Sequence, residues 1–142
     1  MIVIVADTSV YVSALVFGGV PQAALAQAMR PPYRLAVSAE LHAELAETLG
    51  NKFGWASEHI VDAGMRLWKD ALWCSPATVK ASRDPDDDHV LGCAVAADAQ
   101  FLITGDKDLL TLDPFGSVAI VTPSQFLAID AAGAKRDDHD KS

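Results

Sequence analysis

Basic residues are scarce in this sequence of 142 residues. Lys and Arg together number 11, against 19 Asp and Glu, and the net charge is −8. This balance disfavours a broad basic surface of the kind that usually binds nucleic acid. A protein with this charge can still meet phosphate groups through metal ions or through a local basic patch.

Cysteine and long apolar runs are equally scarce. The two cysteines, Cys74 and Cys93, lie far apart and belong to no CxxC or His-flanked pattern. A disulfide scaffold and a structural zinc site are therefore disfavoured, and a reducing cytoplasm is the expected compartment. The apolar start, Met1 to Ala6, is too short for a signal peptide or a membrane span. We expect a cytoplasmic protein with no membrane segment.

Several common enzyme motifs are missing as well. The chain has no GxGxxG, GxxxxGK[ST] or GxSxG, which argues against dinucleotide binding, a P-loop and a hydrolase nucleophile elbow. Hydrophobic residues make up 51% of the chain, enough at this length for one domain with a proper core. We expect that domain to cover residues 1–130 and the polar segment 131–142 to be a disordered tail.

Short apolar runs alternate with longer helical patterns along the chain. The runs predict strands at 2–5, 34–37, 101–103 and 118–121, with a further short strand within 72–79. Helical spacing predicts helices over 8–17, 21–29 and 39–49. Two more are predicted to begin at 57 and 123, and another leads from the acidic run at 84–88 to about 98. Ser38 and Ser57 are the expected N-caps. Strands joined by helices of this length predict right-handed βαβ units and a parallel sheet between helical layers.

Acidic residues follow two of the predicted strands. Asp7 comes directly after the first, and Asp106 follows the strand at 101–103 after Thr104 and Gly105; an acidic run at 84–88 opens the helix between them. Ligands in such sheets bind at the carboxyl ends of the strands. Like charges gathered there repel unless a cation lies among them. Oxygen ligands with little histidine favour Mg²⁺ or Mn²⁺.

Each acid also has a purely structural interpretation. Asp7 and Asp106 could cap the helices that follow them, and the 84–88 run could complement a helix dipole. Glu44 is typical of a solvated helix residue, although Glu40 and Glu47 share its side of the helix. Four acids in five positions exceed what capping needs, so the combination indicates a site. We expect solvated or capping roles for all the histidines, His42, His59, His89 and His139.

Four segments of the chain together resemble the PIN domain family. They are Asp7-Thr8-Ser9, Glu44-Leu45, Asp84-Pro85-Asp86-Asp87-Asp88 and Thr104-Gly105-Asp106-Lys107-Asp108-Leu109-Leu110. The resemblance extends from Met1 to about Ala128 and is closest to the toxins of toxin–antitoxin pairs. It implies a three-layer α/β/α sandwich with a central, mainly parallel sheet. It also implies a Mg²⁺- or Mn²⁺-dependent endoribonuclease that leaves 5′-phosphate ends, with a cognate antitoxin and a homodimer as partners.

The resemblance assigns roles residue by residue. The catalytic acids would be Asp7, Glu44, Asp87 and Asp106, and the metal ligands among them Asp7, Asp87 and Asp106. Accessory positions would be Asp84, Asp88, Asp108, Thr8, Ser9 and Thr104. The family commonly has a variable residue where this chain has Asp88, so Asp88 is an alternative to Asp87 as the catalytic acid and metal ligand of this helix. Ser9 stands where many members of the family have Asn. RNA docking would fall to a few cations such as Lys52, Arg83 or Lys107.

Other functions share part of this pattern. A non-catalytic PIN module that binds RNA or protein would keep the fold, and the intact acidic set argues against it. A Mg²⁺-dependent receiver domain would need paired acids after the first strand and a lysine near the last, whereas Asp7 stands alone and Thr122-Pro123 has no lysine beside it. A haloacid-type phosphatase is disfavoured because Asp7-Thr8-Ser9 lacks the second acid of a DxD motif.

Overall fold

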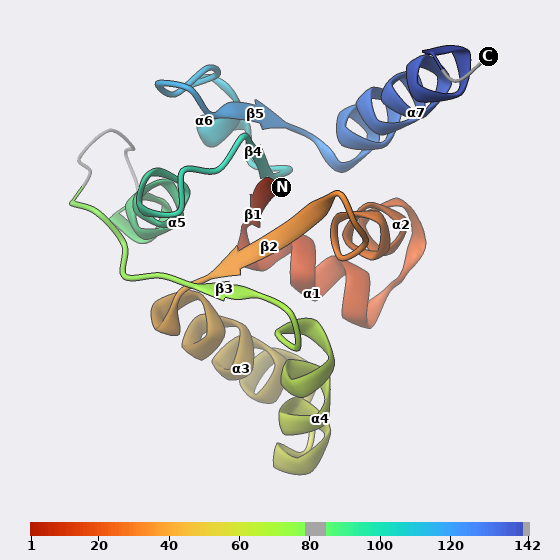
Figure 1. The fold of residues 1–142 in the computed structure, drawn as a ribbon. Helices are drawn as coiled ribbons and strands as arrows, with labels where there is room; N and C mark the ends of the chain where they lie inside the picture. Colours follow the sequence, from red (N-terminus) through yellow and green to blue (C-terminus); the bar gives the residue numbers. More distant parts are fainter. Residues whose placement is uncertain (79–84, 141–142) are drawn as a thin grey trace.

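One parallel sheet forms the centre of the protein (Figure 1). The computed structural model describes the backbone of residues 1–78 and 85–140, and the side chains of residues 1–78 and 88–133. The strand order is β3-β2-β1-β4-β5, and each of the four pairings is parallel. The strands are β1 (Ile2–Ala6), β2 (Tyr33–Val37), β3 (Leu72–Trp73), β4 (Phe101–Ile103) and β5 (Ala119–Val121).

Helices cover both faces of this sheet. One face packs against α1 (Thr8–Val16), α2 (Gly19–Ala28), α3 (Ala39–Phe53), α4 (Ser57–Leu67) and α7 (Pro123–Asp140). The other packs against α5 (Pro85–Ala96) and α6 (Lys107–Leu110), and Figure 1 shows these two helices across the strands from α1 and α3. The predicted three-layer α/β/α sandwich with a parallel sheet is therefore confirmed.

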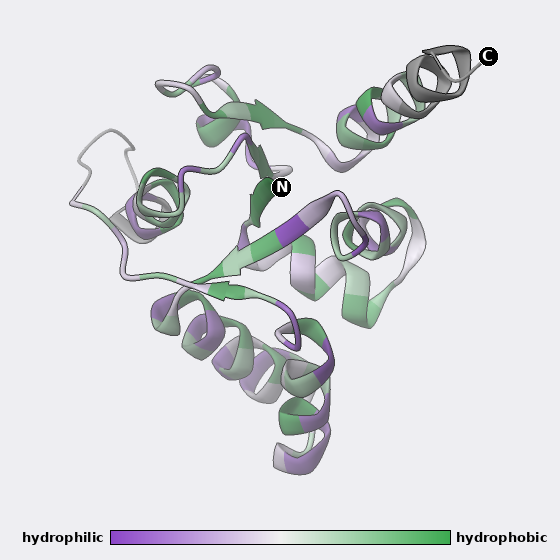
Figure 2. Ribbon diagram, viewed as in Figure 1, coloured by the Kyte–Doolittle hydropathy of each residue, from purple (hydrophilic) through white to green (hydrophobic). Residues whose placement is uncertain are grey.

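The central strand β1 shows why the apolar runs are continuous. Ile4 and Ala6 pack into the core beneath α1–α3, whereas Val5 packs into the core beneath α5, and all three are fully buried. A strand covered on both faces needs apolar side chains at successive positions. Figure 2 shows the same contrast in hydropathy, with strands mostly green and the helices carrying purple stretches.

The N-terminal boundaries of two helices test the predicted caps. Ser38 caps α3, since its Oγ accepts a hydrogen bond from the Leu41 amide at 3.1 Å. The prediction for Ser57 is wrong: it is the first residue of α4, and the cap position belongs to Ala56, which makes no side-chain capping bond. Serine is common both at the cap and within the first turn, so sequence alone shifts such a boundary by one residue.

The last helix, α7, runs from Pro123 to Asp140. Its N-terminal half is anchored, since Phe126 is fully buried and the Tyr33 hydroxyl donates a hydrogen bond to Asp130 at 2.7 Å. The following segment, Ala131 to Arg136, holds three alanines, a lysine and an arginine, which are good helix formers and extend a helix that is already nucleated.

Among the described residues, no single helix is long and apolar enough to cross a membrane. Helices α1 and α2 reach the required length and composition only as a pair, and the chain bends by 114° between them. Both helices contribute buried side chains to the core, including Val10, Tyr11 and Leu25, which accounts for their apolar character.

Candidate active site

Two neighbouring strands end side by side at the carboxyl edge of the sheet. The register of β1 against β4 pairs Ala6 with Ile103. The next residues along these strands, Asp7 and Thr104, are therefore adjacent, and the Asp7 amide donates a hydrogen bond to the Ile103 carbonyl at 3.1 Å. The pairing brings together residues that are 97 positions apart in the sequence.

Asp7 is held by hydrogen bonds to both of its carboxylate oxygens. Oδ1 accepts from the Val10 amide at 3.0 Å and from the Ser9 hydroxyl at 2.9 Å, and Oδ2 accepts from the Thr104 hydroxyl. The residue is only 6% exposed. Asp7 thus caps α1 and also lies at the strand end, so the structural interpretation and the site interpretation apply to the same side chain.

Asp106 is linked to Asp7 through Thr104. The fully buried Thr104 hydroxyl donates to Asp7 and accepts from the Asp106 amide at 3.0 Å. Asp106 caps α6, because its Oδ1 accepts from the Asp108 amide at 2.9 Å. Within the described part of the chain, its second carboxylate oxygen accepts no hydrogen bond and remains available to a ligand.

Burial raises the pKa of Asp7. Its pKa lies above the usual 3.8, chiefly because burial disfavours the charged form, and the nearby charge of Asp106 raises it further. Hydrogen bonds from Thr104, Ser9 and Val10 act in the opposite direction without cancelling this effect. No Lys or Arg among the described residues pairs with Asp7. A cation beside it would stabilise the ionised carboxylate.

We expect the metal-free protein to be stabilised by mild acid through Asp7. Because its pKa is higher in the folded than in the unfolded chain, its contribution is fully present below pH 3.8 and is lost as the pH rises through the folded pKa. The Asp7→Asn variant lacks this contribution. Its melting temperature in EDTA should therefore rise relative to that of the wild type as the pH increases above about 4. A difference that stays constant with pH would contradict this assignment.

Two buried hydroxyls of α1 have no hydrogen-bond partner among the described residues. The Thr8 and Tyr11 hydroxyl oxygens are enclosed and find none among the described residues. Buried hydroxyls are normally satisfied by protein or water. Thr8 is the first residue of α1 and directly follows Asp7 in the sequence.

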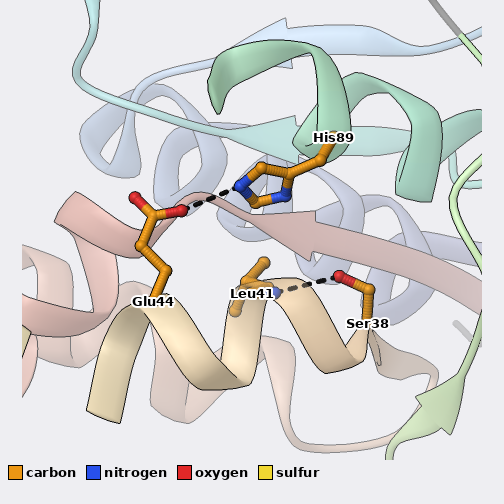
Figure 3. Close-up of polar contacts among 4 residues, drawn as sticks. All are labelled: Ser38, Leu41, Glu44 and His89. Atoms are coloured by element: carbon orange, nitrogen blue, oxygen red, sulfur yellow. Dashed lines mark hydrogen bonds and ion pairs between the residues drawn. The ribbon is translucent and has the colours of Figure 1, made fainter. Parts of the chain in front are cut away.

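The side chain of Glu44 contacts a residue of α5 (Figure 3). Its Oε2 lies 2.8 Å from Nε2 of His89. Glu44 comes from α3, two turns after the Ser38 cap, and His89 comes from the first half of α5. The contact lies in a surface groove of about 530 Å³ that Glu40, Glu47 and Lys52 also line.

Asp87 belongs to the same helix as His89. Its backbone lies in the first turn of α5, and its side chain is outside the described residues, as is the whole of Asp84. The helix packs inward through Val90, Leu91 and Ala94, the residues predicted to share the face of Asp87. Asp88 is partly buried and has an interaction partner, and Asp108 is exposed.

The structure brings Asp7, Ser9, Thr104 and Asp106 together and joins Glu44 to α5. Within the described side chains, no three His, Cys, Asp or Glu residues form a group that could hold a metal ion. The side chain of Asp87, the third predicted ligand, lies outside the described residues. Convergence of all four predicted acids on one pocket therefore stays a prediction.

Two histidines were assigned wrongly from the sequence. His89 was expected to be solvated or capping but pairs with Glu44, 45 positions earlier. His42 accepts a hydrogen bond at Nδ1 from the indole of Trp68, 26 positions later, at 2.9 Å. Glu44 lies in α3 and Trp68 is the C-cap of α4, so no spacing around either histidine could have indicated the contact.

The comparisons with known proteins decide the family. The PIN domain family profile matches residues 3–108. The chain belongs to the PIN domain family. Its fold is similar to that in a 2.2 Å structure of VapBC-1 from nontypeable Haemophilus influenzae, at a TM-score of 0.61 and 16% identity, covering 87% of this chain and 99% of that one.

A second solved structure shares the fold. The PIN domain of T. brucei RRP44 is similar at a TM-score of 0.55 and 16% identity, over 97% of this chain and 86% of that one. No curated protein sequence is significantly similar to the chain. At this identity, the two structures establish the PIN architecture.

Proposed function

We propose that this PIN domain protein is an endoribonuclease that requires Mg²⁺ or Mn²⁺ and is the toxin of a toxin–antitoxin pair. The observation that carries the proposal is the buried Asp7 carboxylate beside Asp106 at the ends of two paired strands, without a pairing Lys or Arg among the described residues. PIN domains are in general nucleases that use divalent metal ions, and membership of the family supports the proposal.

The donor atoms fit a hard divalent cation. Asp7 and Asp106 supply carboxylate oxygens, and Asp106 has one oxygen without a hydrogen bond from the described residues. Thr8, the residue after Asp7, carries a buried hydroxyl that has no hydrogen-bond partner among the described residues. Such an all-oxygen set suits Mg²⁺ or Mn²⁺ better than zinc or copper. Asp7, Asp106 and Asp87 would hold the ion.

The chain's own residues prepare the site for the reaction. Thr104 fixes the Asp7 carboxylate and, through the Asp106 amide, the start of α6. Lys107, exposed beside Asp106, is available to an RNA phosphate, and Lys52 lies in the groove with Glu44. When bound, the metal ion would acidify a water molecule and offset the charge that develops on the scissile phosphate.

Cleavage of RNA tests the enzymatic proposal directly. The purified chain is incubated with a generic single-stranded RNA in Mn²⁺, in Mg²⁺ and in excess EDTA. We expect cleavage in both metals and none in EDTA, with 5′-phosphate ends on the products. A well-folded protein that binds the RNA without cutting it in any metal would instead indicate a non-catalytic PIN module.

The partner part of the proposal needs a separate test. The fold similarity to VapBC-1 supports an antitoxin partner, and we propose that the protein acts in the cytoplasm as a homodimer. A short neighbouring reading frame that encodes a small DNA-binding protein would supply the antitoxin. We expect its product to co-purify with this chain and to suppress the RNA cleavage.

Divalent metal should also stabilise the fold. Because the ion relieves repulsion between Asp7 and Asp106 in the folded chain only, saturation at ~100 times the dissociation constant should raise the melting temperature by roughly 5–10 °C. The measurement is differential scanning fluorimetry, with KCl of equal ionic strength as the control. An equal shift in KCl, or an undiminished shift in the Asp7→Asn variant, would contradict binding at this site.

A further inference from the structure

The fold brings the two cysteines of the chain together. Cys74 directly follows β3, and Cys93 lies in α5, yet their Sγ atoms are only 2.7 Å apart. The Cys74 sulfur also lies 3.8 Å from the Cys93 carbonyl oxygen. Their separation in the sequence argued against a disulfide, and the packing of α5 against the end of β3 removes that argument.

Backbone contacts hold both cysteines in place. The Cys74 amide donates to the Val37 carbonyl at 2.9 Å, which ties it to β2. Three residues later, the Ala77 amide donates to the Gly92 carbonyl at 3.0 Å. Gly92 has no Cβ, and a Cβ there would collide with the Ala77 carbonyl oxygen. The chain after β3 therefore runs tightly against α5, next to Cys93.

The two thiols differ in their access to solvent. Cys93 is fully buried, and its pKa is raised by that burial and by the neighbouring Cys74. Cys74 is partly exposed. Since the thiolate is the nucleophile in thiol–disulfide exchange, a reagent in solution should meet Cys74 first.

We propose that Cys74 and Cys93 are a modification site at which a low-molecular-weight disulfide, such as oxidised glutathione, converts the two thiols to one internal disulfide. The Cys74 thiolate attacks the reagent, forms a mixed disulfide and releases one thiolate. The Cys93 sulfur then attacks the Cys74 sulfur, gives up its proton and displaces the second thiol. The protein loses two hydrogen atoms, and the reagent is reduced to two thiols.

Little movement is needed to close the bond. A disulfide requires the sulfur atoms to approach by about 0.7 Å from their present separation. The bond would join the end of β3, an edge strand that pairs with β2 over two residues only, to α5. His89, the partner of Glu44, lies one turn before Cys93 on the same helix. The disulfide would thus fix α5 beside the candidate site.

The test compares the reduced full-length chain with the same chain treated with oxidised glutathione. Intact mass and thiol titration in denaturant should show the loss of two hydrogen atoms, no attached glutathione and no free thiol. The melting temperature should rise by roughly 5–10 °C and return to its starting value after reduction with dithiothreitol.

Variants that lack one cysteine test whether Cys74 reacts with the reagent first and Cys93 second. Cys93→Ser should retain one glutathione on Cys74, because no second thiol is present to displace it. Cys74→Ser should stay unmodified while folded, because Cys93 is buried. A wild-type chain that keeps glutathione on Cys74 beside a free Cys93, or that keeps both thiols, would overturn the proposal. These outcomes do not depend on RNA cleavage, so they are independent of the proposed enzymatic activity.

Discussion

Replacing Asp7 by Asn is expected to lower metal-dependent RNA cleavage by roughly 100-fold or more while leaving the metal-free fold at least as stable as the wild type. The carboxylate supplies the charge that holds the cation, and the amide does not. The amide oxygen can still accept from the Val10 amide and the Ser9 hydroxyl, so the cap of α1 remains. Removing a buried charge with a raised pKa also removes a cost of folding at neutral pH.

Asp7→Ala is the matched control for this variant. It should be equally inactive but should lose about 1 kcal/mol of stability, because it removes the capping oxygen as well as the charge. Activity is measured by cleavage of a generic RNA in Mn²⁺, and stability by urea unfolding in EDTA. If Asp7→Asn unfolds as readily as Asp7→Ala, a structural capping role for Asp7 becomes the better explanation of its inactivity.

Asp87 and Asp88 should differ sharply in their effect on cleavage. Successive residues of a helix point about 100° apart, and α5 packs inward through Val90, Leu91 and Ala94, whereas Val95 is 45% exposed. Asp87 is predicted to share the face of Val90, Leu91 and Ala94, and Asp88 to point toward Leu91 and Val95. We therefore expect Asp87→Asn to lose cleavage by roughly 100-fold or more, and Asp88→Asn to retain most of it.

The two variants control for each other, because each removes one charge from the same helical turn. Circular dichroism and melting in EDTA should first show that both are folded. Cleavage is then compared at equal Mn²⁺ concentration. If Asp88→Asn is the inactive variant, the helix register used for this prediction is wrong by one residue, and Asp88 takes the place of Asp87 among the proposed ligands.

The architecture follows closely from the sequence because its signals are local. The β-branched run Ile2 to Val5 predicts a strand buried on both faces, and β1 is central in the sheet. The adjacency of Asp7 and Asp106 follows from a general rule, that functional residues gather at the carboxyl ends of parallel strands. Both acids were also predicted as possible caps, and both act as caps.

The contacts that sequence reasoning missed all join separate elements. The pairs Glu44–His89, His42–Trp68 and Cys74–Cys93 each connect side chains 19 to 45 positions apart. Their formation depends on how α3, α4 and α5 pack, and residue periodicity within one helix carries no information about the neighbour it meets.

The pairing of β1 with β4 also determines when the acidic edge of the sheet can form during synthesis. Asp7 is synthesised 97 positions before its hydrogen-bond partner Thr104. Contacts between such distant segments form late, because a long loop must close first. A nascent chain on the ribosome would lack the complete acidic edge until β4 has emerged and docked. For a proposed ribonuclease, this delay would keep the unfinished chain from cutting the RNA around it during translation.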